Sequence, residues 1–374
     1  MTNPLKKLAE LGQSVWYDYI RRDLYQGGEL RRLIEEDGLS GMTSNPTIFQ
    51  KAIADTDLYD DAIRRLSGRS LSAAALFEAL EVEDVRAAAD VFRPVFDRAK
   101  GDDGFVSIEV NPALSHDTEG TVAEARRLWR ACDRPNVMVK IPGTSEGIPA
   151  IRQCLAEGIN INITLLFSVS RHREVMEAYL SALEARVKAG QPVDGLRSVA
   201  SFFVSRVDTL VDKKLDALAA SGPEDRRKSA RALRGKVAIA NARLAYEAFE
   251  QTFAGERFRA LAARGARRQR PLWASTSTKD PAYTALYYVE ALVAPDSVDT
   301  MPPETYARYA REGRPQVRIH DDLAGARDAF RDLAALGIDA SKVAAELEQE
   351  GEQKFVASFE QVVKAVEEKT KVVA

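Results

Sequence analysis

Short apolar runs alternate with longer amphipathic stretches along nearly the whole chain. Short apolar runs of this kind are typical of buried β-strands. Eight of them are predicted as strands, at residues 14–19, 39–43, 105–110, 136–141, 159–165, 198–203, 271–275 and 297–301. Helical periodicity fills most of the intervals, for example at 120–132, 147–157 and 171–189. This alternation predicts an α/β fold, and eight units favour a closed (β/α)8 TIM barrel over an open sheet.

Two intervals are too long for one crossover helix. Residues 46–104 and 207–270 each have room for two or three helices, and the pattern of 303–374 is helical throughout. Residues 1–12 resemble a short leading helix. The sequence has no internal repeat and no Pro-, Gly- or Ser-rich boundary. We therefore expect a single barrel domain over 1–374, with helical insertions in the two long intervals and a helical C-terminal segment.

Composition and charge narrow the possible partners. The 374 residues are 45% hydrophobic and 29% charged, with a formal net charge of −3, which gives no support to a nucleic-acid or membrane partner. The arginine-rich stretch 257–270 is interpreted as a solvated helix face. Cys132 and Cys154 form no CxxC pair, and the N-terminus lacks the apolar core of a signal peptide. A cytoplasmic protein with free thiols is expected.

Polar residues occupy positions that should face the inside of the barrel. Strands of a parallel barrel are covered by helices, so their outward residues should be aliphatic. In 159–165 the isoleucines and Leu165 form the outward set, which leaves Asn160, Asn162 and Thr164 inward. Such groups pack poorly in a core unless each has a hydrogen-bond partner. Mutual hydrogen bonding through buried water is the structural alternative to a functional site.

The same alternation turns Asp18, Glu109, Lys140 and Ser201 inward at the C-terminal ends of other strands, where barrel enzymes build their sites. Lys140 lies among apolar residues, two positions before the Pro142-Gly143 pair that ends the run. A buried, unpaired ammonium is costly and tends to lose its proton, and the neutral amine is a nucleophile in Schiff-base chemistry. The alternative is a lysine on an edge strand with its amine in solvent.

Five motifs on successive predicted strands resemble one family. They are Thr43-Ser-Asn-Pro46, Ser107-Ile-Glu-Val110, Val137-Met-Val-Lys-Ile-Pro142, Asn162-Ile-Thr-Leu-Leu-Phe-Ser168 and Ser201-Phe-Phe-Val-Ser-Arg206. Over essentially its whole length the chain resembles the transaldolases, transferases of the non-oxidative pentose phosphate pathway. The resemblance implies transfer of a dihydroxyacetone unit from sedoheptulose 7-phosphate to glyceraldehyde 3-phosphate, giving erythrose 4-phosphate and fructose 6-phosphate.

The resemblance also implies a division of catalytic roles. Lys140 would form the Schiff base with the ketose carbonyl. Asp18 would take the proton from the C4 hydroxyl as the C3–C4 bond breaks. Glu109 would relay protons through a water held by Thr164. Because the iminium itself accepts the electron pair, neither a metal nor a cofactor is expected.

Substrate binding is assigned in the same way. Asn45, Asn162 and Ser201 would bind the donor hydroxyls, and Arg206 would bind its phosphate. Many relatives carry a second phosphate-binding arginine after the seventh strand, where this chain has a hydroxyl cluster and Lys279. Lys279 is therefore the candidate replacement. Small-molecule sugar phosphates are the expected partners, and a monomer and a homodimer are both compatible with the composition.

The tyrosine-flanked Asp18 and the chain length indicate a longer, single-domain subfamily. It is related to the transaldolase part of transaldolase/glucose-6-phosphate isomerase fusions. A class I fructose-6-phosphate-type aldolase, which releases the free three-carbon unit, would use the same lysine and remains an alternative. A non-catalytic sugar-phosphate-binding barrel is the other. A metal-dependent aldolase is disfavoured, since His116, His172 and His320 lack ligand spacing.

Overall fold

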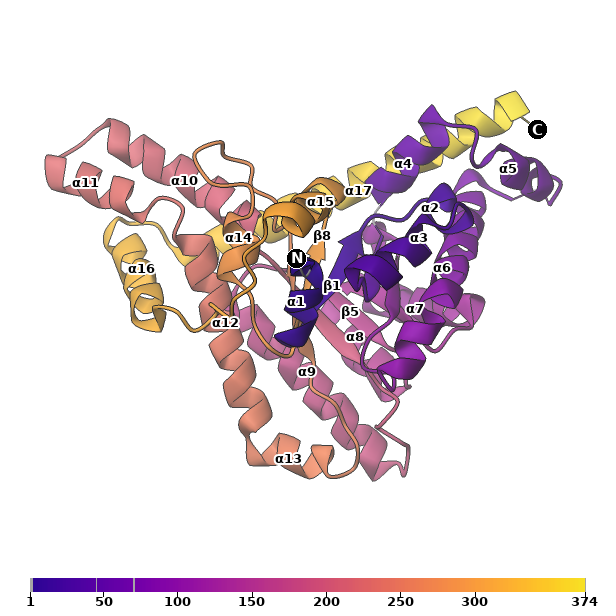
Figure 1. The fold of residues 1–374 in the computed structure, drawn as a ribbon, viewed down its shortest axis with the longest axis horizontal. Coiled ribbons are helices and arrows are strands. Elements are labelled where there is room, and N and C mark those ends of the chain that lie inside the picture. Colours follow the sequence, from indigo (N-terminus) through magenta and orange to yellow (C-terminus); the bar gives the residue numbers. More distant parts are fainter. Residues whose placement is uncertain (1–2, 45, 70, 374) are drawn as a thin grey trace.

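The computed structural model describes residues 3–44, 46–69 and 71–373. Within them eight parallel strands close into a barrel in sequence order (Figure 1). The strands are β1 (Gln13–Asp18), β2 (Gly41–Thr43), β3 (Phe105–Glu109), β4 (Val137–Pro142), β5 (Ile161–Leu166), β6 (Ser198–Phe203), β7 (Arg270–Ala274) and β8 (Ser297–Met301). Each lies within two residues of a predicted strand at both ends, and the predicted (β/α)8 TIM barrel is confirmed.

The barrel interior is filled by side chains from alternate strand positions, as predicted. Trp16 on β1 is fully buried and stands opposite Gly41 on β2. A Cβ atom on Gly41 would lie 2.4 Å from the Trp16 indole, so only glycine leaves room for this ring. The two residues therefore close the lower part of the barrel and leave the polar positions near the strand ends above it.

The alternation predicted for the fifth strand fails at its last residue. The β5–β6 register shifts between Ile163 and Leu166, and Leu165 adopts a positive φ of 61°. A β-bulge re-aims the side chain it contains. Leu165 accordingly lies against the C-terminal helix, where a Cβ on Gly351 would stand 2.9 Å from its Cδ2 atom.

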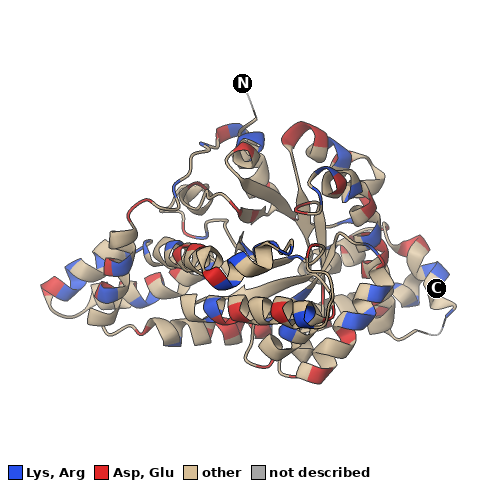
Figure 2. Ribbon diagram, turned by 90° about the horizontal axis from the view of Figure 1, so that it is seen from below, with Lys and Arg blue, Asp and Glu red and all other residues tan. Residues whose placement is uncertain are grey.

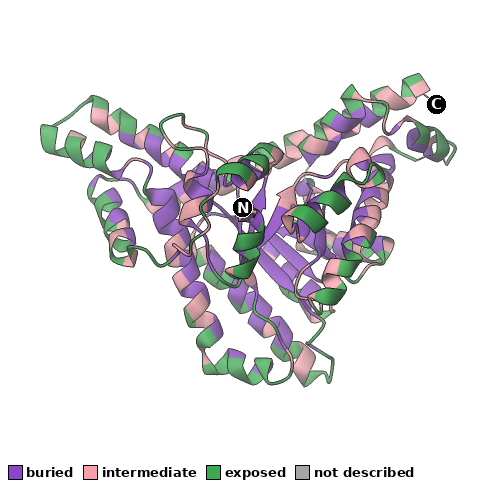
Figure 3. Cartoon of the chain, in the orientation of Figure 1, coloured by how far each residue is buried: buried purple, intermediate pink, exposed green. Residues whose placement is uncertain are grey.

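Helices surround the barrel, with their buried faces toward the strands and their exposed faces outward (Figure 3). They are α1 (Pro4–Glu10), α2 (Arg22–Gln26), α3 (Glu29–Arg32), the π-helix η1 (Leu33–Asp37), α4 (Pro46–Asp55), α5 (Asp60–Ser67), α6 (Ala73–Arg98), the 3-10 helix η2 (Pro112–Leu114), α7 (Thr118–Cys132), α8 (Gly147–Ala156), α9 (Val169–Lys188), α10 (Ser205–Ala220), α11 (Glu224–Leu233), α12 (Val237–Ala254), α13 (Glu256–Ala262), α14 (Tyr287–Ala291), α15 (Pro303–Glu312), α16 (Leu323–Ala335) and α17 (Ala340–Val373). Helices α4 to α6 occupy the first long interval, and α10 to α13 occupy the second.

The C-terminal tail is less regular than its pattern predicts. Between α15 and α16 the chain leaves the helical conformation over residues 313–322, which begin with a glycine and contain a proline. Both residues disfavour a continuous helix. The last helix, α17, then packs against α10, β5, α4, α5 and α6 (Figure 1).

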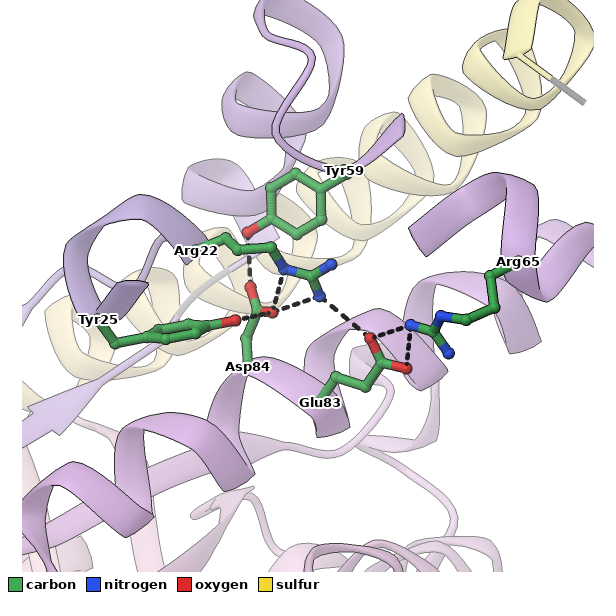
Figure 4. A network of polar contacts seen from close by, with 6 residues as sticks. All are labelled: Arg22, Tyr25, Tyr59, Arg65, Glu83 and Asp84. Carbon is green, nitrogen blue, oxygen red and sulfur yellow. Dashed lines mark hydrogen bonds and ion pairs between the residues drawn. The ribbon is translucent and has the colours of Figure 1, made fainter. Parts of the chain in front are cut away.

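A buried polar network fastens the segment after β1 to α6 (Figure 4). Arg22 donates to Asp84 at 2.6 Å, and Tyr25 and Tyr59 donate to the same carboxylate at 2.9 and 2.6 Å. Asp84 is 0% exposed, so its charge depends on these donors. The network therefore links the C-terminal end of β1 to the helices of the first insertion.

The described helices include none that is long and apolar enough to cross a membrane. On the outer helices basic and acidic side chains are interspersed (Figure 2). Such a mixture does not create a large field of one sign.

Candidate active site

A cavity of about 320 Å³ lies at the C-terminal end of the barrel. The predicted site residues that line it are Asp18, Lys140, Thr164, Ser201, Arg206 and Lys279. Glu109 and Asn162 do not line the cavity, but Glu109 contacts Lys140 and Asn162 accepts a hydrogen bond from Ser201. Asn45 lies outside the described residues. The structure therefore brings together side chains from β1, β4, β5, β6, α10 and the loop after β7.

Lys140 is held inside the barrel on a central strand. Strand β4 pairs with both β3 and β5, which excludes the edge-strand alternative. The side chain is only 7% exposed, and its Nζ atom lies 3.3 Å from Glu109 Oε2. Nζ also donates to the backbone oxygen of Ser44 at 3.3 Å. The expected burial is confirmed, but the amine has a carboxylate beside it.

Glu109, at the end of β3, is the acid closest to this amine. Burial raises the pKa of its carboxyl to about 7, because the charged form is poorly solvated there, although the neighbouring Lys140 opposes the shift. Its Oε1 atom and the hydroxyl of Thr164 are both buried, and among the described residues neither has a hydrogen-bond partner. A bound water would satisfy such groups.

A hydrogen-bond chain fixes the amide of Asn162. Ser201 Oγ donates to Asn162 Oδ1 at 2.7 Å, and Asn162 Nδ2 donates to Ser107 Oγ at 3.0 Å. These contacts cross from β6 through β5 to β3, so one side chain is oriented by two neighbours. Asn160 behaves differently, since its Nδ2 donates to the backbone oxygens of Pro135 and Val137 near the start of β4. That contact is structural and does not belong to the cavity.

Asp18, at the end of β1, is oriented by threonines that the sequence analysis did not single out. Thr43 Oγ1 donates to Asp18 Oδ1 at 2.8 Å. The hydroxyl of Thr43 also lies 2.8 Å from that of Thr300 on β8. Thr300 lies opposite Trp16 and on the same face as Val298. Because aliphatic strand positions were expected to face outward, the alternation within 297–301 does not reveal that Thr300 faces inward.

Two cations line the cavity near the ends of β6 and β7. Arg206 is in the first turn of α10, with its guanidinium 5.0 Å from the Phe203 ring. One of its terminal nitrogens is buried and has no partner among the described residues, and burial lowers the pKa of this group. Lys279 Nζ donates to Ser277 Oγ at 2.7 Å. This end of the cavity is suited to an anionic group of a ligand.

The C-terminal helix supplies residues that strand patterns could not reveal. Lys354, Phe355 and Ser358 of α17 line the same cavity. The Phe355 ring centroid lies 5.2 Å from Lys140 Nζ. Nothing in the helical periodicity of the tail indicates which part of the barrel this helix contacts.

No group of three or more His, Cys, Asp or Glu side chains in the described part of the chain is placed to hold a metal ion. What this arrangement can do chemically follows from its members. It has a nucleophilic amine, an acid whose pKa is near neutrality, a second carboxylate and an anion-binding end. These are the groups that Schiff-base chemistry on a phosphorylated carbonyl compound requires.

Comparison with known proteins identifies the family. The family model described as Transaldolase/Fructose-6-phosphate aldolase matches residues 15–366. The chain is 49% identical to "Transaldolase" of Frankia alni, over 97% of this chain and 96% of the relative. It is 46% identical to "Transaldolase" of Mycobacterium leprae, over 100% and 98%, and 43% identical to "Transaldolase 2" of Nostoc sp., over 100% and 99%. The chain therefore belongs to the transaldolase/fructose-6-phosphate aldolase family.

Proposed function

We propose that this protein is a transaldolase that moves a dihydroxyacetone unit between sugar phosphates. The observation that carries the proposal is the buried amine of Lys140, 3.3 Å from the Glu109 carboxylate at the mouth of a barrel. The full-length similarity to proteins named transaldolase supports the same activity. The donor would be sedoheptulose 7-phosphate or fructose 6-phosphate, with glyceraldehyde 3-phosphate or erythrose 4-phosphate as acceptor.

The first step joins the donor to Lys140. The neutral amine attacks the ketose C2 carbon, and the resulting carbinolamine loses its hydroxyl as water to give the iminium. The departing hydroxyl needs a proton, which Glu109 would provide through a water bound beside Thr164. A carboxyl whose pKa is about 7 is suited to both giving and regaining this proton at neutral pH.

The second step breaks the C3–C4 bond. Asp18 would take the proton from the C4 hydroxyl, and the bonding electron pair moves into the iminium to give an enamine on Lys140. The C4 end leaves as an aldehyde. Reaction of the enamine with the acceptor aldehyde reverses these steps and returns the proton from Asp18. Thr43 would keep the Asp18 carboxylate directed at the hydroxyl.

Binding groups would hold the two ends of the sugar phosphate. Asn162 and Ser201, already aligned by their mutual hydrogen bond, would bind donor hydroxyls. Arg206 and Lys279 would bind the phosphate, with Lys279 in place of the second arginine of many relatives. Asn45 stays a predicted contributor. These residues would hold the donor in the orientation that the reaction needs, and correct orientation alone can lower the barrier substantially.

The remaining expectations concern the molecule as a whole. We propose a single barrel domain spanning the chain, acting in the cytoplasm. The buried, unpaired thiols of Cys132 and Cys154 fit a reducing compartment.

Reductive trapping tests the proposed chemistry. Incubation with fructose 6-phosphate and borohydride should add an irreversible mass to a peptide containing Lys140, and Lys140→Ala should abolish the adduct while remaining folded. Lys213→Ala, on the exposed part of α10, provides a control that should still be labelled at Lys140. A donor that binds without ever forming the adduct would instead favour the non-catalytic sugar-phosphate-binding barrel.

Addition of erythrose 4-phosphate then distinguishes the two enzymes. A transaldolase converts fructose 6-phosphate and this acceptor to sedoheptulose 7-phosphate. A class I aldolase releases free dihydroxyacetone at the same rate with and without the acceptor. That second outcome would contradict the transferase assignment while leaving the Schiff base intact.

A further inference from the structure

An aromatic ring of the C-terminal helix lies beside the Lys140 amine. Phe355 of α17 lies with its ring centroid 5.2 Å from Nζ, and it lines the cavity with its neighbour Lys354. At this distance the ring face attracts a cation. Its hydrocarbon surface also occupies space that water would otherwise fill next to the amine.

Glycine allows α17 to come this close. Gly351 is buried one turn before Phe355, and a Cβ atom there would stand 2.9 Å from Leu165 Cδ2 and 3.7 Å from a terminal nitrogen of Arg206. The bulge in β5 directs Leu165 toward this point. This contact of α17 with the barrel thus lies beside the proposed phosphate-binding arginine, one turn before Phe355 on the same helix.

Polar contacts hold α17 on both sides of Phe355. They are made with α10, α9, the segment before α7, α4 and α5: Lys214–Glu346 at 2.8 Å, Arg171–Glu348 at 3.5 Å, His116–Glu352 at 2.8 Å, Thr47–Ser358 at 3.0 Å and Lys369–Asp60 at 3.0 Å. Each pair alone contributes little, because most are partly exposed. Together they restrict the helix to one position across the barrel end.

The proposed reaction has one intermediate that the Phe355 ring could protect from water. After C3–C4 cleavage the three-carbon unit stays on Lys140 as an enamine until an acceptor aldehyde arrives. If a proton adds to the enamine carbon first, the iminium returns, and water then adds to its carbon. The C–N bond breaks, free dihydroxyacetone leaves and the amine is regenerated. A site that retains the unit for transfer must therefore keep bulk water from this adduct, while it holds the single water proposed beside Thr164.

We propose that Phe355 is a specificity-determining residue that excludes bulk water from the Lys140 adduct and so favours transfer over release of dihydroxyacetone. The inference rests on the proposed function. Phenylalanine suits the task because it carries no polar group that could orient a water. The position of the ring on α17 also makes the degree of exclusion depend on how firmly that helix is held.

The test compares two products from the same enzyme. With fructose 6-phosphate, dihydroxyacetone release is measured without an acceptor, and sedoheptulose 7-phosphate formation is measured with erythrose 4-phosphate. Phe355→Ala should raise the ratio of release to transfer by about tenfold, which corresponds to a change of about 1.4 kcal/mol in the difference between the two barriers. Phe355→Leu, which keeps most of the apolar volume, should raise it less. Borohydride should still label Lys140 in both.

Phe359 offers a matched control on the same helix. It lies one turn further along and packs against Phe77, with ring centroids 5.7 Å apart. Phe359→Ala removes a contact outside the cavity and leaves the Phe355 ring in place, so it should change the product ratio much less than Phe355→Ala. The inference is overturned if Phe355→Ala lowers both activities in proportion, or if Phe359→Ala changes the ratio as much. Failure of the proposed function would look different, since the unmodified protein would then form no Lys140 adduct or no sedoheptulose 7-phosphate.

Discussion

At the scale of single residues, the pairing of Lys140 with Glu109 decides what the site can do. The amine lies 3.3 Å from the carboxylate, and both side chains are almost fully buried. Burial disfavours the charged form of the Glu109 carboxyl, while the neighbouring Lys140 favours it. The pKa of Glu109 at about 7 is the balance of these effects. The carboxyl can therefore change protonation state within the pH range of the cell.

This balance makes Schiff-base formation dependent on pH. Below pH 7 the Glu109 carboxyl holds a proton that it can pass to the leaving hydroxyl, and above pH 7 it has lost that proton. We therefore expect the single-turnover rate of adduct formation, trapped with borohydride, to fall as the pH rises through about 7. In Glu109→Gln this rate should be lower by about 10²–10⁴-fold and should no longer fall as the pH rises through about 7. If the rate of adduct formation still fell near pH 7 in Glu109→Gln, a group other than Glu109 would be responsible for the pH dependence.

At the scale of secondary-structure elements, buried polar contacts hold the segments that follow the strands. The clearest is the network around Asp84, which links the segment after β1, the turn before α5 and α6 (Figure 4). A second lies after β7, where the loop that carries Lys279 is attached to α10. Both stabilise backbone that positions site residues without touching the cavity themselves.

Removal of the carboxylate from the first network should be costly. In Asp84→Ala the Arg22 guanidinium, which is nearly buried, would lose its main partner, and two tyrosine hydroxyls would lose their acceptor. We expect the free energy of unfolding to fall by about 3–5 kcal/mol, as for other broken buried ion pairs. Chemical denaturation would measure this. Asp61→Ala on the exposed face of α5, where the carboxylate is 98% exposed, is the control and should change it by less than about 0.5 kcal/mol.

The loop after β7 provides the second test. Tyr283 donates to Asp212 Oδ2 at 2.6 Å, and Arg234 bonds Asp280 at 2.5 Å, so the loop is attached on both sides of Pro281. Tyr283→Phe should raise the KM for fructose 6-phosphate by about fivefold at little cost in kcat, since a lost hydrogen bond amounts to about 1 kcal/mol.

Two comparisons decide whether this effect acts through the phosphate. The KM for an unphosphorylated acceptor such as glyceraldehyde should change much less in Tyr283→Phe. Tyr309→Phe is the matched control, because among the described residues the buried Tyr309 hydroxyl has no partner. Equal losses for phosphorylated and unphosphorylated substrates would show that the loop contact is only structural.

At the scale of the whole molecule, α17 joins distant parts of the chain. It contacts α4, α5 and α6 of the first insertion as well as α10 and β5. Its residues complete a cavity otherwise built from strand ends and the loops that follow them. The last part of the chain thus determines how open the site is.

A bulky residue at Gly351, where α17 contacts Leu165, should separate α17 from the barrel. Gly351→Leu would place atoms where Leu165 already lies, and overpacking of this kind costs about 1–3 kcal/mol of stability. We expect a lower midpoint of thermal unfolding together with faster release of dihydroxyacetone. The same change at Gly68, where a Cβ would meet nothing within 4 Å, should affect neither. Loss of stability without any change in product release would contradict a role of this contact in closing the site.

The barrel and most of its inward-facing polar residues could be predicted because strand alternation is a local property. A residue such as Lys140 or Asn162 is placed inward by its immediate neighbours, and parallel strands of similar length align their C-terminal ends. The bulge at Leu165 could not be predicted, because it depends on contacts with β6 and Gly351. Thr300 could not be predicted in this way either, because it shares its face of β8 with the aliphatic Val298.

The sequence by itself therefore determined the eight strands, their order in a barrel and the set of side chains that converge at one end. Only the tertiary structure decided that Glu109 lies beside Lys140 at 3.3 Å and that Phe355 covers the amine. Helical periodicity shows which face of α17 is apolar but not which surface that face covers. The position of this helix is set by packing between segments that lie far apart in the chain, and no local pattern contains that information.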